Sequence, residues 1–183
     1  MQEMPTLLVI DVQRAFDLPD WGPRNNVYAE ERIAKLLAHW RLSGAPIVHI
    51  QHRSDTAEGR FRGDGLQFKP EAIPKDGEPV IEKSVNSAFI GTNLEQRLRA
   101  AGTRELVIAG FTTDHCCSTT ARMAANLGFT TFVVADAMAT FARRAPDGDL
   151  IDAETIHRTA LASLMDEFAT VIDSDGARSL IEQ

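Results

Sequence analysis

Three side chains spread along the sequence could together carry out acyl transfer to sulfur. They are the carboxylate of Asp11, the ammonium of Lys83 and the thiol of Cys116. A nearby ammonium favours the thiolate, which is the nucleophilic form of cysteine. A carboxylate can accept the thiol proton and later donate it to a leaving amine. These residue types therefore predict attack on a carbonyl carbon, a covalent thioester and its hydrolysis.

Each of the three residues also has an ordinary structural interpretation. A free cysteine is more often a buried core residue than a nucleophile, and this is the role we expect for the adjacent Cys117. Asp11 alone would be a turn or cap residue, and Lys83 alone a surface lysine. The catalytic hypothesis is favoured because all three complementary groups fall at strand ends of one predicted sheet.

The elements that must position these groups alternate between apolar strands and amphipathic helices, which is typical of βαβ units and a parallel sheet. The predicted strands are residues 7–10, 47–50, 79–82, 105–109, 131–135 and 169–172. The predicted helices are residues 27–42, 92–102, 116–127 and 152–165, the second of them opened by a capping box. We expect an α/β protein with a three-layer αβα fold around a six-stranded, mostly parallel Rossmann-like sheet, in a single domain over residues 1–183.

The three reactive residues fall where such a fold places its ligands. In open α/β sheets, ligands bind at the carboxyl ends of the strands, near the point where the strand order reverses. Asp11 ends the first predicted strand, Lys83 ends the third and Cys116 follows the fourth. If the first and fourth strands flank the reversal, Asp11 and Cys116 become neighbours. The turn at residues 110–115 would place the thiol at a helix N-terminus, where the macrodipole favours the thiolate and backbone N–H groups can stabilise an oxyanion.

A long segment at about residues 53–79 has no clear periodicity and is rich in glycine, proline and charge. Such a length within a compact domain predicts a lid, a binding loop or a mobile segment inserted into it. Arg60 and Arg62 in this loop could recognise an acidic group, although a solvated loop is the simpler interpretation. His52 ends the second strand on the same rim, where it either contacts substrate or pairs with a carboxylate.

Four aromatic residues near predicted strand ends or loops could line an apolar pocket or belong to the core. They are Phe16, Trp21, Phe89 and Phe141. We expect Phe16, Phe89 and His52 to contact a small-molecule substrate.

Composition argues against some other classes of partner. The chain has 183 residues and a net charge of -7, and such a surface repels the phosphates of nucleic acids. No apolar run is long enough to span a bilayer, and residues 1–6 lack the basic start and apolar stretch of a signal peptide. We therefore expect a cytoplasmic protein with no nucleic-acid or membrane partner.

Three segments, in order along the chain, resemble the motifs of the isochorismatase-like cysteine hydrolases, a family that includes nicotinamidases and N-carbamoylsarcosine amidases. Residues 7–16 resemble its apolar strand followed by D-x-Q-x-x-F, and residues 83–89 resemble its K-x-x-x-S-A-F segment. Residues 110–116 resemble its G-x-x-T-x-x-C signature, and the similarity continues to about Asp136.

The resemblance implies a role for each reactive residue. It implies that Cys116 is the nucleophile, that Asp11 is the general acid and base, and that Lys83 stabilises the thiolate and the transition state. It also implies a cis peptide between Phe111 and Thr112, with the N–H groups of Thr112 and Cys116 forming the oxyanion hole. Members of the family mostly assemble as dimers or larger oligomers, so we expect a homodimer or a larger homo-oligomer.

The sequence departs from the nicotinamidase pattern after the second strand. Nicotinamidase-type members carry D-x-H there and a further histidine, and these residues bind a metal. Here residues 49–55 read H-I-Q-H-R-S-D, and no histidine lies between His52 and His115. We therefore expect no metal and no cofactor. The departure argues against nicotinamide as the substrate, because its ring nitrogen commonly contacts that metal.

The full Cys–Asp–Lys set favours a hydrolase that cleaves an amide, ureido or lactam C–N bond of a small molecule through a thioester on Cys116. One alternative keeps the fold and hydrolyses the vinyl ether of isochorismate, a reaction that some members perform without a nucleophilic cysteine. A second alternative is a non-catalytic, oligomeric binding protein of the same fold. The presence of Cys116 speaks against the first alternative, and the intact set speaks against the second.

Overall fold

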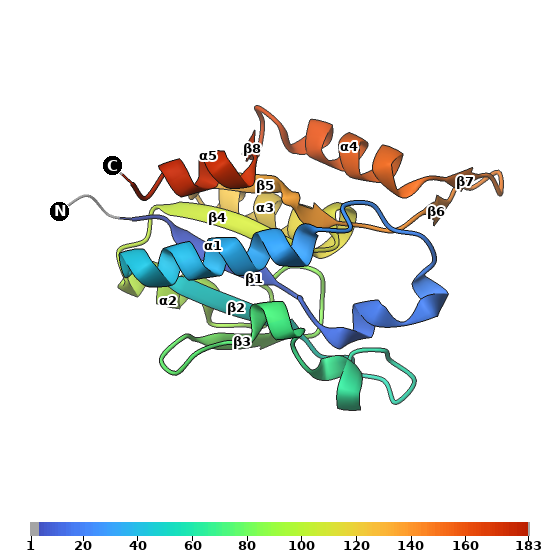
Figure 1. Ribbon diagram of the computed structural model, residues 1–183, viewed down its shortest axis with the longest axis horizontal. Coiled ribbons are helices and arrows are strands. Elements are labelled where there is room, and N and C mark those ends of the chain that lie inside the picture. Colours follow the sequence, from blue (N-terminus) through green and yellow to red (C-terminus); the bar gives the residue numbers. More distant parts are fainter. Residues whose placement is uncertain (1–3, 183) are drawn as a thin grey trace.

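The computed structural model describes residues 4–182 and is built around a twisted, six-stranded parallel sheet in the order β3-β2-β1-β4-β5-β8 (Figure 1). The strands are β1 (Thr6–Ile10), β2 (Ile47–His52), β3 (Val80–Lys83), β4 (Glu105–Phe111), β5 (Thr130–Ala139) and β8 (Thr170–Ile172). A separate antiparallel pair, β6 (Arg143–Arg144) and β7 (Leu150–Ile151), projects beyond the sheet. The predicted six-stranded parallel sheet is confirmed.

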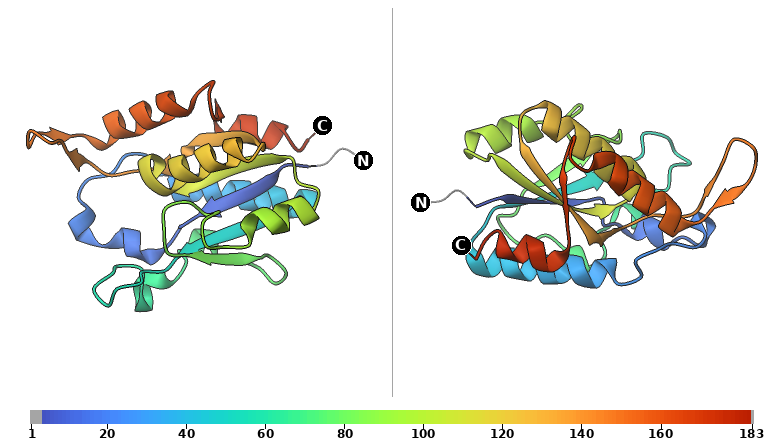
Figure 2. Two further views of the ribbon diagram at one scale, coloured as in Figure 1. Left: turned by 180° about the vertical axis from the view of Figure 1, so that it is seen from behind. Right: turned by 90° about the horizontal axis from the view of Figure 1, so that it is seen from above.

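Helices cover both faces of the sheet and give the fold its three layers, as predicted (Figure 2). One face carries α1 (Ala29–Ser43) and α5 (Ser174–Ser179), and the other carries α2 (Leu94–Ala100), α3 (Ser118–Asn126) and α4 (Ala153–Leu164). Within residues 4–182, every helix is too short or too polar to cross a lipid bilayer.

The core lies in two layers, one on each face of the sheet. Successive residues of β1 point to opposite faces. Leu7 and Val9 join the core under α1, whereas Leu8 and Ile10 join the core under α3. Burial on both faces explains why this strand is apolar throughout.

The strand order reverses between β1 and β4, at the place that the sequence suggested. β1 pairs with β2 on one side and with β4 on the other. In this register Ile10 lies between Ile50 and Gly110, so the residues that follow β1 and β4 emerge side by side. His52 and Lys83 pair at the ends of β2 and β3. The carboxyl ends of four neighbouring strands therefore form one rim, where ligands bind in such sheets.

Residues 53–79 contain no α-helix and no strand of the sheet, as predicted, but they include two short 3-10 helices, Gly63–Leu66 and Pro70–Ala72. The segment packs against the connection between β1 and α1. Arg14 N–H donates to Gln67 O (2.9 Å), and Lys69 N–H donates to Val12 O (3.0 Å). The long loop is therefore fastened to the chain that follows Asp11.

The predicted capping box of α2 is wrong. Asn93 occupies the N-cap position and makes no side-chain cap bond. Thr92 lies one residue earlier, where its hydroxyl donates to Ala88 O (2.6 Å) and accepts from Leu94 N–H (3.3 Å). The hydroxyl is therefore used by the loop that enters the helix.

Gly110 is required where β4 passes β1. Its φ is +130°, and a Cβ there would lie 2.0 Å from Ile10 O. Gly110→Ala should therefore separate the two central strands and lower the free energy of unfolding by about 3 kcal/mol or more, measured by urea denaturation. Gly148→Ala is the control, because Gly148 has a φ of +98° but its Cβ would meet nothing within 4 Å. Equal losses in the two variants would contradict the close approach as the cause.

Candidate active site

The ends of β1 and β3 and the turn after β4 bring the three reactive side chains together. Lys83 Nζ lies 2.7 Å from Asp11 Oδ2 and 3.3 Å from Cys116 Sγ. The side chains of Asp11 and Lys83 are 0% exposed, and Cys116 is 8% exposed. The three groups therefore meet as the sequence predicted, and their catalytic roles stay predictions.

Asp11 turns away from the line of β1 because its backbone has a positive φ of 52°. Aspartate adopts this left-handed conformation more readily than most residues. Its N–H donates to Ile50 O (3.0 Å), and its C=O accepts from Gln13 N–H (2.8 Å). The backbone that carries the carboxylate is therefore fixed on both sides.

Gln13 belongs to the site although its position in the sequence predicted no role. Its side chain accepts from His52 N–H (2.8 Å) and donates to His52 O (2.9 Å) and Leu66 O (3.0 Å). The buried amide joins the end of β1 to the end of β2 and to the long loop. The D-x-Q motif contains this residue, but only the fold shows which backbone groups it holds.

A turn between β4 and α3 presents Cys116. The peptide between Phe111 and Thr112 is cis, as predicted. Thr113–Cys117 form a π-helical turn, so α3 begins at Ser118 and not at Cys116 as expected. Thr112 and Cys116 line one cavity, and their N–H groups stay the predicted oxyanion hole.

Two sets of contacts hold this turn from behind. Thr113 Oγ1 lies 2.8 Å from Nδ1 of His157, a residue of α4. Asp114 accepts hydrogen bonds from the hydroxyl of Thr140 and from Arg143 Nε (2.9 Å). The partners lie far apart in the sequence, so no local pattern predicted them. Together they tie the turn to α4 and to the segment that follows β5.

The electrostatics of the resting site differ from the expectation. Burial raises the pKa of the Cys116 thiol, the charge of Asp11 raises it further, and Lys83 opposes both without outweighing them. Burial alone would lower the pKa of Lys83, but the charge of Asp11, together with hydrogen bonds to Asp11 and to the Cys116 sulfur, outweighs burial, and that pKa is raised. The thiol therefore stays protonated beside a charged ammonium. The expected thiolate is wrong for the resting site, because desolvation of the sulfur is the larger effect.

Asp11 retains an acceptor for the thiol proton. Its Oδ1 atom is buried and has no hydrogen-bond partner within residues 4–182. A carboxylate oxygen of Asp11 lies within 4.8 Å of Cys116 Sγ. A buried acceptor without a donor is unfavourable, so the Asp11 carboxylate, at this distance from the sulfur, is available to accept a proton.

A small cavity of about 150 Å³ lies beside Cys116. Its wall is largely aromatic, because the ring of Phe16 lies 5.1 Å from the rings of both Trp21 and Phe61. The ring of His52 lies 4.7 Å from that of Phe61. Phe61 comes from the long loop, so that loop contributes directly to the cavity.

The predicted substrate contacts divide into two groups. Phe16 and His52 line the cavity, and a contact with substrate stays a prediction for both. Phe89 does not line this cavity, since its ring stacks on Phe129 with centroids 6.0 Å apart, in the core under α2 and α3. Phe89 therefore matches the sequence motif, but the fold does not place it at the cavity wall.

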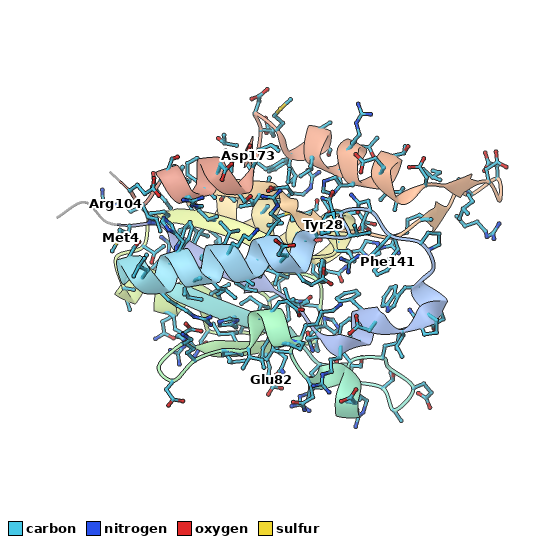
Figure 3. All side chains as sticks on the ribbon, in the orientation of Figure 1. Met4, Tyr28, Glu82, Arg104, Phe141 and Asp173 are labelled. Carbon is cyan, nitrogen blue, oxygen red and sulfur yellow. The ribbon has the colours of Figure 1, made fainter. Side chains whose placement is uncertain are left out.

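Residues just outside the cavity hold its aromatic wall. Phe141, which Figure 3 labels, stacks on Trp21 with ring centroids 5.2 Å apart. Arg60 pairs with Asp20 (2.6 Å) and lies 4.2 Å above the Trp21 ring. Arg62 donates to backbone carbonyls of its own loop. Both arginines are thus engaged in fastening the loop.

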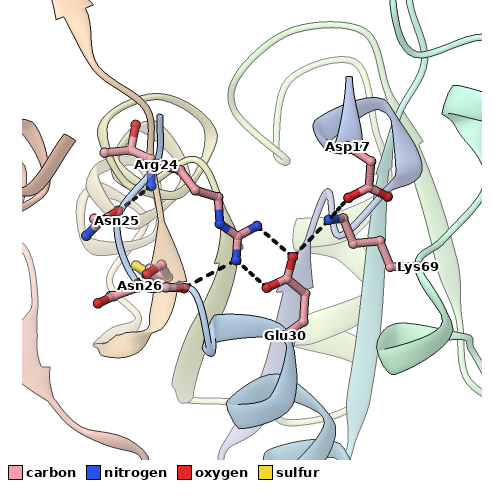
Figure 4. Close-up of polar contacts among 8 residues, drawn as sticks. Asp17, Arg24, Asn25, Asn26, Glu30 and Lys69 are labelled. Carbon is pink, nitrogen blue, oxygen red and sulfur yellow. Dashed lines mark hydrogen bonds and ion pairs between the residues drawn. The ribbon is translucent and has the colours of Figure 1, made fainter. Parts of the chain in front are cut away.

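An ion network joins the start of α1 to the long loop and to the segment between β1 and α1 (Figure 4). Glu30 accepts from Arg24 and from Lys69 (2.8 Å), and Lys69 also pairs with Asp17. The guanidinium of Arg24 and the ammonium of Lys69 lie 5.2 and 5.6 Å from the centre of the Phe111 ring. Both cations therefore contact the aromatic residue that precedes the cis peptide.

Asp11, His52 and Cys116 carry atoms of the kinds that bind metal ions, and these atoms lie within 4.8 Å of one another. All three, however, already face the Lys83 ammonium, at 2.7 Å from Asp11 Oδ2, 3.0 Å from His52 Nδ1 and 3.3 Å from Cys116 Sγ. A metal ion within reach of the same three atoms would lie against this positive charge. The arrangement does not fit a metal at this position.

Comparisons with known proteins agree on one family. A family model described as the isochorismatase domain matches residues 5–176. The isochorismatase family protein YrdC of Bacillus subtilis is 48% identical over 96% of this chain and 95% of its own length. Nicotinamidase 3 of Arabidopsis thaliana is 36% identical over 96% of this chain and 88% of its own length. A crystal structure of an isochorismatase-family protein from Chromobacterium violaceum superposes with a TM-score of 0.96 at 43% identity, covering 99% of this chain and 95% of that one.

The buried pair of Asp11 and Lys83 generates a stability prediction. Lys83→Met leaves the Asp11 carboxylate buried without its countercharge, so we expect the free energy of unfolding to fall by about 3 to 5 kcal/mol. The double variant Asp11→Asn with Lys83→Met removes both charges and should recover part of this loss. Urea denaturation of the two variants and the parent measures the difference. Equal losses in the single and double variants would show that the two charges are not coupled.

The ion network generates a prediction of pH dependence. Burial alone would raise the pKa of Glu30, but hydrogen bonds from Arg24 and Lys69 outweigh it and hold that pKa at about 2. Because the folded pKa lies below the usual value, the stabilisation is fully present above about pH 4.5 and is lost as the pH falls toward 2. At neutral pH it is on the order of 3 kcal/mol.

Glu30→Gln should therefore make the free energy of unfolding depend less on pH between pH 4.5 and pH 2. Urea midpoints at several pH values measure this dependence. Glu31→Gln is the matched control, since the neighbouring Glu31 makes only an exposed pair with Lys35, and such pairs contribute little. If the stability of Glu30→Gln falls with pH as steeply as that of the parent, the pH dependence does not come from Glu30.

Proposed function

Because this chain belongs to the isochorismatase family of hydrolases, we propose that it is a cysteine hydrolase that cleaves a carbon–nitrogen bond of a small molecule through a thioester on Cys116. One observation carries the proposal: the buried ammonium of Lys83 contacts both the Asp11 carboxylate and the Cys116 sulfur beside a small cavity. The relationship to a protein named as a nicotinamidase supports cleavage of an amide.

Acylation begins with the substrate carbonyl carbon beside Cys116 Sγ. The thiol proton passes to Asp11 Oδ1 as sulfur attacks the carbon, and negative charge develops on the carbonyl oxygen. The backbone N–H groups of Thr112 and Cys116 would stabilise that charge. The C–N bond then breaks, and the amine leaves with the proton that Asp11 received.

Hydrolysis of the thioester reuses the same groups. A water molecule gives a proton to Asp11 while its oxygen attacks the thioester carbon. The C–S bond breaks, Cys116 recovers the proton from Asp11, and the carboxylic acid leaves. In both steps Lys83 stabilises the negative charge that develops on sulfur.

The cavity limits the acyl part of the substrate. Its volume of about 150 Å³ is comparable to that of an apolar cavity that binds benzene. Three aromatic rings form much of the wall, beside the imidazoles of His52 and His115, and no arginine or lysine is among the described residues that line it. A carboxylate on the acyl part would therefore meet no permanent positive charge in the wall. We propose a compact, neutral carboxamide with an acyl part no larger than a benzoyl group.

Ammonia release from a panel of carboxamides tests the proposal. We expect compact neutral amides such as benzamide and isobutyramide to be hydrolysed in preference to anionic ones such as maleamate. Cys116→Ala should lower kcat/KM by about 10⁴-fold or more, because the nucleophile is removed. Cys117→Ala is the matched control and should retain activity, since that thiol is fully buried in the core.

Three outcomes would contradict the proposal. Amide hydrolysis that survives Cys116→Ala would exclude the covalent mechanism. Pyruvate release from isochorismate, unaffected by Cys116→Ser, would identify vinyl-ether hydrolysis instead. No turnover of any amide, together with no labelling of Cys116 by acylating reagents, would favour a non-catalytic binding protein.

A further inference from the structure

We propose that His52 is a positioning residue whose imidazole holds the Lys83 ammonium in the orientation that reaches Asp11 and Cys116 at once. The inference deepens the proposed function and rests on it for its kinetic consequence. Its basis is a short contact, since His52 Nδ1 lies 3.0 Å from Lys83 Nζ. Neither the sequence motifs nor the residue's place at the end of β2 predicted this contact.

The ammonium of Lys83 has three N–H donors and three acceptors around it. Asp11 Oδ2 lies at 2.7 Å, His52 Nδ1 at 3.0 Å and Cys116 Sγ at 3.3 Å. The Lys83 side chain is fully buried, so a donor without an acceptor would be unfavourable. Without His52, one N–H would lack a partner, and the ammonium could turn away from the sulfur or from the carboxylate.

The fold fixes the imidazole before any substrate binds. His52 and Lys83 are register partners at the ends of neighbouring strands β2 and β3. The Gln13 side chain bonds to both the N–H and the C=O of His52, and the Phe61 ring lies 4.7 Å from the imidazole. Backbone and ring are therefore both held, as a positioning role requires.

Burial, together with the charge of Lys83, keeps the His52 ring neutral. Burial lowers the pKa of His52, and the charge of Lys83 lowers it further, while Asp11 and Asp55 oppose these effects without outweighing them. His115 is the other titratable imidazole that lines the cavity. A neutral ring that accepts at Nδ1 carries its proton on Nε2. The contact with Lys83 therefore requires the Nε2–H tautomer of His52.

Kinetics of two variants of nearly equal shape test the positioning role. The Oδ1 atom of asparagine can occupy the place of the imidazole Nδ1, whereas leucine offers no acceptor. On the best amide substrate, His52→Leu should lower kcat about tenfold or more with KM changed less than about twofold, because the lost contact acts on the reacting groups. His52→Asn should stay within about threefold of the parental kcat. Equal kcat values for the leucine variant and the parent would overturn the inference.

Nuclear magnetic resonance tests the contact without any substrate. The ¹⁵N shifts of the His52 ring in the unmodified protein should show the Nε2–H tautomer. In Lys83→Met, the pKa of His52 should rise, because the neighbouring positive charge is removed. An Nδ1–H tautomer in the unmodified protein would overturn the inference even if Lys83→Met fails to fold. If the tautomer is Nε2–H but no amide is hydrolysed, the contact is supported and the proposed function fails.

Discussion

The candidate site depends on one buried ammonium group, that of Lys83. A charge removed from water is tolerated only when acceptors and a countercharge surround it. The Asp11 carboxylate and the Cys116 sulfur supply two of these contacts from chain segments 72 and 33 residues away. Asp11 depends on Lys83 in turn, because its own side chain is fully buried. Folding therefore assembles these groups together, since neither charge would be stable in this place alone.

The topology of the sheet makes that assembly possible. β1 lies between β2 and β4, so the residues that follow it meet those that follow both neighbours. Gly110 lets β4 approach β1 more closely than a residue with a side chain would allow. The Gln13 amide then fixes the backbone at the end of β2, and the cations of the Glu30 network contact Phe111, whose ring packs against Phe16 in the cavity wall. These contacts hold in place either the groups that accept hydrogen bonds from the Lys83 ammonium or the cavity beside them.

The convergence of Asp11, Lys83 and Cys116 could be predicted, because each follows an apolar strand and parallel strands end on one rim. Local periodicity does not show what a side chain meets across the fold. The thiol pKa depends on how deeply the sulfur is buried, and the contact of His52 with the ammonium depends on the register of β2 and β3. Phe89 lies in a matching motif yet packs in the core. α5 and the β6–β7 pair are too short to show a period.

A protonated resting thiol is compatible with catalysis for a reason of charge. The Asp11 carboxylate and the Lys83 ammonium already neutralise each other, so loss of the Cys116 proton to solvent would leave a net negative charge in a buried site. Transfer of that proton to Asp11 instead keeps the total charge at zero, because the ammonium then faces the sulfur. The thiolate would therefore form only as the proton moves inside the site, from sulfur to the Asp11 carboxylate.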